Sequence, residues 1–194
     1  MTKIANIPLI DIQKFAREAQ ELRGTNPLTD FSRVCEDVPP GCDISATQVG
    51  WQAYGFWRSV LGQIVPAQQS ESMGQPWLRL SIETEVPRLC QRCLKPLVLP
   101  VRVDRPFRFV ADEAAAIAED EDSEEDILVW SRDFDLHGLL EDEILLDLPL
   151  IPLHDECQAP AGFDLAAPAD EASANADMRQ PFADLASLMK KGKA

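Results

Sequence analysis

The chain has 194 residues, 45% of them hydrophobic, which is enough for one domain with a buried core. It carries 18 basic and 33 acidic side chains, a formal charge of −15, which argues against a protein that binds nucleic acid over its whole surface. Five scattered cysteines and the absence of an apolar run of roughly 18 residues exclude a disulfide scaffold and a membrane-spanning helix, so we expect a cytoplasmic location.

Two amphipathic helices are predicted near the N-terminus. The first has Asp11 as its cap and Gly24 as its stop. Its apolar face comprises Ile12, Phe15, Ala16, Ala19 and Leu22. The second is capped by Thr29 and ends at Pro39. Its apolar face comprises Leu28, Phe31, Val34, Cys35 and Val38. Both faces follow the helical period, so we expect both helices to pack on a core.

Residues 47–65 are rich in aromatic and β-branched side chains and contain three glycines. This composition predicts short or bulged strands. Trp51, Tyr54 and Trp57 could in principle stack on exposed bases. We interpret them as core residues, because large aromatic side chains are usually buried. Residues 66–76 are expected to form a loop.

A β-hairpin with a cysteine pair in its turn is the centre of the sequence. Residues 78–86 and 101–109 alternate apolar with polar side chains, which predicts two half-buried strands. Cys90 and Cys93 lie between them, where prolines disfavour a helix, so a thioredoxin-type dithiol is the weaker interpretation. Six cations around this turn are candidate contacts to RNA phosphates: Arg88, Arg92, Lys95, Arg102, Arg105 and Arg108.

The acidic charge is concentrated in the second half of the chain. Residues 111–184 hold 22 acidic and two basic side chains, whereas the remainder holds 11 acidic and 16 basic ones. Nine of these carboxylates fall within residues 112–126, which we expect to form an exposed acidic loop.

A short strand and a helix are predicted after this loop. The strand covers residues 127–130, and the helix is capped by Asp135 and ended by Pro149 and Pro152. Its apolar stripe comprises Leu136, Leu139, Leu140 and Ile144. Its exposed side is expected to carry Glu141, Asp142 and Glu143.

These elements predict an α+β fold, with a mainly antiparallel sheet or partly closed barrel and flanking helices. We expect residues 1–157 to form a single core domain. Residues 158–178 are rich in Ala, Asp and Pro, which predicts a linker. Residues 179–194 are predicted to form a C-terminal docking helix with a basic tail.

The sequence offers a candidate ligand set for zinc. Cys90 and Cys93 supply two of the four ligands of a tetrahedral site, and His154 and Cys157 are the pair that could complete it. Asp155 and Glu156 give the second pair the character of a remnant ligand set. We therefore expect no stoichiometric cofactor, with zinc at these four residues as the alternative.

A metal-dependent nuclease is the weakest functional class considered. It would use the cluster of Asp133, Asp135, His137 and Glu141. Capping of the helix and a solvated acidic face explain the same residues, and no second cluster provides a nucleophile or general base. We expect no catalytic activity.

Three motifs resemble the large ribosomal RNA subunit accumulation protein (YceD) family. They are Cys-Gln-Arg-Cys-Leu-Lys-Pro at 90–96, Leu-Glu-Asp-Glu-Ile-Leu-Leu-Asp-Leu-Pro-Leu-Ile-Pro-Leu-His-Asp at 140–155, and Pro-Phe-Ala-Asp-Leu-Ala-Ser-Leu-Met-Lys-Lys at 181–191. Within these motifs, the residues singled out as family positions are Cys90, Cys93, Pro96, Glu141, Asp142, Glu143, Pro149 and His154. Some relatives carry further cysteines where this chain has His154 and Cys157.

The resemblance implies a noncatalytic factor in ribosome biogenesis that supports synthesis, processing or stability of large-subunit (23S) ribosomal RNA. Its expected partners are ribosomal RNA or a precursor of the large subunit, and no membrane. The alternative is an acidic adaptor or chaperone that binds a basic ribosomal protein without contacting RNA, which the net charge of −20 in residues 111–184 makes a serious one.

Overall fold

The computed structural model describes residues 7–59, 74–120, 123 and 125–160. The chain divides into two units, Met1–Gln158 and Ala159–Ala194. The predicted C-terminal helix and nearly all of the predicted linker therefore lie outside the described residues. Within the described part, no helix is both long and apolar enough to cross a membrane.

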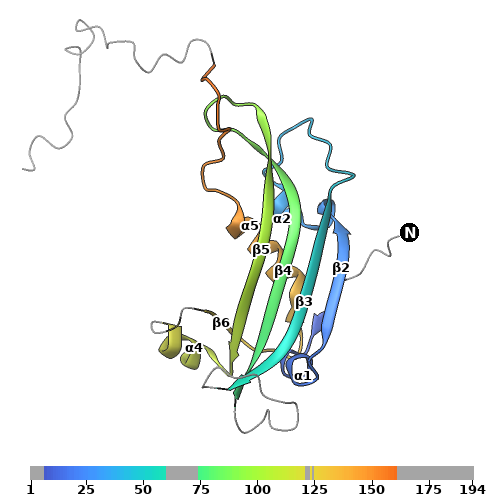
Figure 1. The fold of residues 1–194 in the computed structure, drawn as a ribbon, viewed down its shortest axis with the longest axis vertical. Coiled ribbons are helices and arrows are strands. Elements are labelled where there is room, and N and C mark those ends of the chain that lie inside the picture. The colour runs from blue at the N-terminus through green and yellow to red at the C-terminus, as the bar shows by residue number, and fades with distance from the viewer. Residues whose placement is uncertain (1–6, 60–73, 121–122, 124, 161–194) are drawn as a thin grey trace, which may run out of the picture. The chain divides into compact units, whose positions relative to one another are not determined.

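A five-stranded sheet forms the body of the first unit (Figure 1). Its strands, in spatial order, are β2 (Glu21–Pro27), β3 (Gln48–Ser59), β4 (Gly74–Leu89), β5 (Pro96–Val110) and β6 (Asp126–Val129). The first four are antiparallel neighbours, and β6 runs parallel to β5. A separate two-stranded sheet pairs β1 (Leu9–Ile10) with β7 (Phe134–Asp135). The α+β class and the antiparallel sheet are confirmed; the sheet is open, because β2 and β6 are its two edges.

The helices that close the core lie on one face of this sheet. They are α1 (Ile12–Arg17), α2 (Ser32–Cys35), which follows a 3-10 turn at Leu28–Asp30, and α5 (Leu136–Asp147). Figure 1 shows α2 and α5 behind the long strands. The core joins apolar residues of these helices to inward residues of the strands such as Trp51, Leu80 and Val103. Trp51 and Val103 both pair with Ile82 of β4, and Leu80 lies two residues from Ile82, so all of them share one face of the sheet, as a period-two pattern requires.

Two predictions near the N-terminus are corrected. The first helix ends at Arg17, and Leu22 and Gly24 belong to β2. Strand pairing overrides the helical periodicity here, since β2 pairs with β3 over its full length. A Cβ at Gly24 would lie 2.7 Å from the ring of Trp51, so this glycine permits close packing and is not a helix stop.

The second predicted helix and the strands after it also differ from expectation. The helical segment is a 3-10 turn followed by four residues of α-helix, and Phe31, not Thr29, precedes α2. The expected core residues Leu28, Phe31 and Val34 are buried. Residues 48–59 form one continuous strand, and residues 74–76, expected in a loop, begin β4.

Two predictions about acidic residues are wrong. The expected loop 112–126 contains the helix α4 (Glu113–Asp120), which leads into β6. A parallel neighbour of β5 needs such a crossover, because a tight turn can only join antiparallel strands. In α5, Glu141 and Glu143 are buried at 4% exposure each, although we expected them on the exposed side.

Candidate metal centre

The turn between β4 and β5 presents two cysteine sulfurs. The backbone N–H of Cys90 donates to the carbonyl of Lys95, and the N–H of Leu94 donates to the carbonyl of Cys90, both at 2.9 Å. Leu94 has a φ of 58°, the left-handed conformation that non-glycine residues rarely adopt. These features fold the segment 90–95 into a compact loop with Cys90 and Cys93 buried.

The segment that follows α5 brings the second pair of ligands to this loop. Pro149 and Pro152 prevent the helix from continuing, so the chain leaves it in an extended form. The backbone N–H of Gln91 donates to the carbonyl of Pro152 at 2.9 Å, and the Arg92 guanidinium donates to the carbonyl of Cys157 at 3.4 Å. These contacts anchor residues 152–157 beside the hairpin turn.

The four predicted ligands converge. The sulfurs of Cys90 and Cys93, the nearest ring nitrogen of His154 and the sulfur of Cys157 all lie within 4.8 Å of one another. Cys90 Sγ is 3.7 Å from Cys157 Sγ, and Cys93 Sγ is 3.3 Å from His154 Nδ1. Among the described residues, this is the single cluster that could hold a metal ion.

The spacing fits a tetrahedral zinc site. With zinc–sulfur bonds of about 2.3 Å and zinc–nitrogen bonds of about 2.0 Å, tetrahedral angles place two sulfurs about 3.8 Å apart and a sulfur and a nitrogen about 3.5 Å apart. The sulfur–sulfur distance agrees closely, and the sulfur–nitrogen distance is slightly shorter. Three cysteines and one histidine are also a donor set that structural zinc sites use.

The electrostatics of the site favour a thiolate at Cys90. Burial raises the pKa of this thiol, but hydrogen bonds from the backbone N–H groups of Cys93, His154 and Arg92 outweigh burial and bring the pKa to about 5. The pKa of Cys157 is raised, by burial and then by its contacts with the other two cysteines. A thiolate surrounded by donor N–H groups is the form of cysteine that binds a metal.

The six candidate RNA contacts do not form one surface. Arg88 is buried at 8% exposure, and burial lowers its pKa. Arg105 lies on the helix side of the sheet, 3.6 Å from Glu143, and Arg108 pairs with Glu119 of α4. The remaining three, Arg92, Lys95 and Arg102, are exposed. Arg102 is 3.5 Å from Glu83, and both of these side chains are largely in solvent.

The carboxylate and imidazole cluster considered for a nuclease has structural roles. Asp135 caps α5, because its carboxylate accepts from the N–H of Gly138 at 3.0 Å. His137 stacks on Phe31 with ring centroids 5.0 Å apart. Glu141 accepts from the backbone N–H and Nε of Arg33 at 2.6 and 2.8 Å. The carboxylates thus point to different partners and do not converge on a common site.

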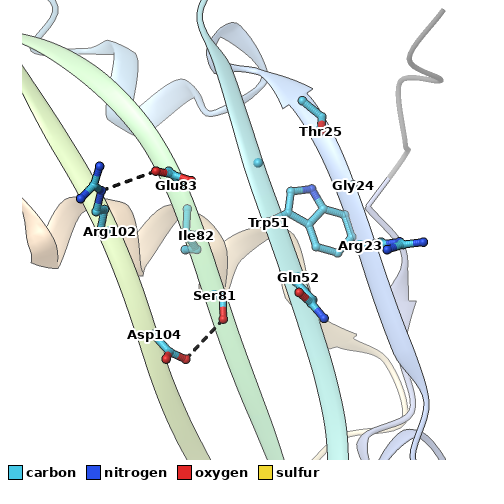
Figure 2. Close-up of a pocket in the computed structure, with 11 residues that line it drawn as sticks. Arg23, Gly24, Thr25, Trp51, Gln52, Ser81, Ile82, Glu83, Arg102 and Asp104 are labelled. Atoms are coloured by element: carbon cyan, nitrogen blue, oxygen red, sulfur yellow. Dashed lines mark hydrogen bonds and ion pairs between the residues drawn. The ribbon is translucent and has the colours of Figure 1, made fainter.

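Sequence reasoning missed the face of the sheet opposite the helices. Trp51 and Trp57 are buried as expected, but Tyr54, interpreted as a core residue, is 38% exposed on this face, because it lies one position out of phase with them along β3. Figure 2 shows a groove on this face, with Gln52, Ser81, Glu83, Arg102 and Asp104 on neighbouring strands. Its volume is about 1200 Å³. Next to it, the rings of Tyr54, Phe56 and Trp77 form a row. The sequence contained a pattern that indicates this face. Every second residue from position 52 to position 58 lies on the same face of β3, and these residues are Gln52, Tyr54, Phe56 and Arg58.

Comparison with known proteins gives one family. A family model described as "Large ribosomal RNA subunit accumulation protein YceD" matches residues 78–189, which include the hairpin, both ligand pairs and α5. No solved structure matches the chain.

Proposed function

The chain belongs to the YceD family of large ribosomal RNA subunit accumulation proteins, and we propose that it is a noncatalytic cytoplasmic factor for the biogenesis of the large ribosomal subunit. In this role it supports synthesis, processing or stability of the large-subunit (23S) ribosomal RNA. The observation that carries the proposal is the family match over more than half of the chain. A noncatalytic role is supported by the structural use of Asp135, His137 and Glu141.

RNA contact is proposed for the exposed cations Arg92, Lys95 and Arg102. Arg92 and Lys95 are exposed, and Arg102 is 79% exposed although it lies beside the similarly exposed Glu83. Arg88 is buried, Arg108 pairs with Glu119, and Arg105 lies beside the buried Glu143. Exposed cations, including one in an ion pair that solvent screens, can exchange their counterions for RNA phosphates.

A specific observation also favours the alternative, an acidic adaptor for a basic ribosomal protein. A groove of about 800 Å³ runs between α5 and the segment after α2, and it is lined by Leu146, Leu150, Glu36 and Asp37. Leu150 is 97% exposed and Leu146 is 67% exposed. Apolar side chains beside carboxylates suit an amphipathic basic segment of a protein.

Deletion of the gene from its host, followed by measurement of the ratio of large- to small-subunit ribosomal RNA, tests the proposal. We expect the ratio to fall and to be restored by the wild-type gene. Crosslinking in cells, with sequencing of bound RNA and mass spectrometry of bound proteins, separates the two mechanisms. An unchanged ratio would contradict the assembly role, and recovery of a basic ribosomal protein without RNA would favour the adaptor.

We further propose that Cys90, Cys93, His154 and Cys157 hold one structural zinc ion. The proposal is supported by the convergence of the four ligand atoms within 4.8 Å and by the backbone N–H groups around Cys90. Such an ion would join the hairpin turn to the segment after α5 and exclude water from the sulfurs, so its binding free energy would add to the stability of the fold.

Elemental analysis of protein purified without added metal tests the zinc site. We expect about one zinc per chain, as in a closed four-ligand site, and a loss of zinc and thermal stability in Cys157→Ala. Cys42→Ala is the matched control, because Cys42 lies outside the cluster and should leave the zinc content unchanged. Zinc-free wild-type protein whose melting temperature is insensitive to a chelator would refute the site.

A further inference from the structure

We propose that the open face of the sheet is a platform for a single-stranded segment of RNA, with bases stacked on Tyr54 and the partly exposed Phe56, and with the buried Trp77 supporting Phe56 from below. This inference rests on the proposed function and deepens it, because it names the surface and the form of RNA that it would recognise. The observations that carry it are an aromatic row and an adjoining polar groove.

The aromatic row lies across two central strands. Phe56 and Trp77 are direct partners in the pairing of β3 with β4, and Tyr54 is two residues from Phe56 on the same face. Ring centroids are 6.0 Å apart for Tyr54 and Phe56, with an interplanar angle of 13°, and 5.9 Å apart for Phe56 and Trp77, with an angle of 25°. The Arg58 guanidinium lies 5.0 Å from the centroid of the Trp77 ring. Tyr54 is 38% exposed, so a base can reach its ring.

Near-parallel aromatic rings on an open antiparallel sheet suit unpaired bases. Each base has an apolar face that can stack on such a ring, whatever its sequence, and an arginine plane adds a second stacking partner. A base within a duplex cannot use the row, because both of its faces are already covered by its neighbours in the stack.

The groove beside the row suits the backbone and base edges of the same strand. It has Arg23 on β2 and Arg102 on β5, with the hydrogen-bonding side chains of Gln52 and Ser81 between them (Figure 2). Gly50 lies opposite Glu83 in the sheet and carries no side chain that would fill the groove. From Gly50 to Phe56, the strand rises about 20 Å, which is long enough for a few nucleotides.

The charge of the face is less hostile to RNA than that of the chain as a whole. By strand register it carries five arginines (Arg23, Arg58, Arg79, Arg102 and Arg108) and four carboxylates (Glu21, Glu83, Glu85 and Asp104), and Glu119 of α4 pairs with Arg108. The whole chain has a formal charge of −15. A face with as many cations as carboxylates in such a protein repels a polyanion less than its average surface does.

Fluorescence anisotropy with a labelled 12-nucleotide single-stranded RNA, and with the same strand in a duplex, tests the platform. We expect the full-length protein to prefer the single strand, and Tyr54→Ala to weaken that binding about fivefold or more. The matched control is Leu9→Ala on β1, an exposed apolar residue outside the five-stranded sheet, which should bind like the wild type. Melting temperatures verify that both variants are folded.

Photocrosslinking of 4-thiouridine RNA, mapped by mass spectrometry, gives a second readout, for which we expect adducts in β3 or β4. Unchanged binding by Tyr54→Ala, or adducts confined to Arg92 and Lys95, would overturn the platform while leaving the proposed function intact. Absence of any RNA binding by the wild type would overturn the platform as well. The proposed function would fail separately, by an unchanged ratio of ribosomal RNAs in the deletion strain.

Discussion

At the scale of single residues, the two buried carboxylates of α5 behave in opposite ways. Burial raises the pKa of Glu141, but hydrogen bonds from the side chain and backbone of Arg33 outweigh it, so the pKa is lowered. For Glu143, burial is the largest effect and the pKa is raised, with Arg105 opposing it. The charged carboxylate of Glu141 therefore links α2 to α5, whereas burial favours the protonated form of the Glu143 carboxyl group.

Glu141→Gln should lower the free energy of unfolding at pH 7 by about 1 to 2 kcal/mol, because it weakens charge-assisted bonds to an arginine that solvent partly screens. A lowered carboxyl pKa stabilises the fold above the unfolded value of about 4.3, and this contribution is lost as the pH falls through the folded pKa. Urea unfolding at pH 7 and at lower pH measures it, and the difference between wild type and variant should shrink in acid.

Asp142→Asn is the control for this prediction. Asp142 contacts the same arginine, but its side chain is 53% exposed, so its removal should cost much less. Equal losses for the two variants, or a difference between Glu141→Gln and wild type that does not depend on pH, would contradict the role assigned to Glu141.

At the scale of elements, the packing of α1 on β3 depends on a glycine. A Cβ at Gly55 would lie 2.5 Å from the ring of Phe15 and 2.7 Å from its carbonyl oxygen. The helix therefore approaches the strand so closely that no side chain fits between them. At Gly50, in the same strand, the nearest atom would be 3.7 Å away, an ordinary contact.

Gly55→Ala should destabilise the protein by about 1 to 3 kcal/mol, the usual cost of an overpacked contact that the backbone must relieve. Gly50→Ala should be neutral or slightly stabilising, since alanine restricts the unfolded chain more than glycine does. Thermal or urea unfolding of the two variants makes the comparison. A Gly55→Ala variant as stable as Gly50→Ala would show that α1 can move away from β3 without cost.

At the scale of the whole molecule, the positions of cations and carboxylates on the surface depend on the fold more than on their order in the sequence. The six cations of residues 88–108 are distributed over the turn, the helix side of the sheet and its open side, and Arg88 among them is buried. Three of them, Arg92, Lys95 and Arg102, are exposed and proposed to meet phosphates. The remaining charge is mostly negative and should repel RNA elsewhere on the surface.

The affinity for single-stranded RNA should fall with salt as these few phosphate contacts release counterions. Three contacts give a slope of log affinity against log salt of about −2, or roughly a 20-fold loss between 50 and 200 mM salt. Changing Arg92, Lys95 and Arg102 together to glutamine should flatten the slope. A titration across this range measures it, and an affinity that does not change with salt would argue against phosphate contacts altogether.

The sequence by itself determined the central hairpin, the cap and core stripe of α5 and the identity of the four residues that could hold a metal. Each of these is a local property: the period of two in residues 78–86, the Asp135 cap, and the chemistry of Cys90, Cys93, His154 and Cys157. Local patterns were weakest where pairing with a distant strand competed with helix periodicity, as at Leu22 and Gly24.

Only the tertiary structure decided which of these residues act together. In the sequence alone, His154 and Cys157 resemble a remnant ligand pair. The structure brings them beside Cys90 and Cys93, because the carbonyl of Pro152 accepts from the N–H of Gln91 in the hairpin turn, about sixty residues earlier. Strand register placed Tyr54 and Phe56 beside Trp77, and α2 supplied the arginine that allows Glu141 to be buried. Such contacts depend on chain segments far apart in sequence, and the free energy that selects them comes from packing of the whole core, which no local pattern contains.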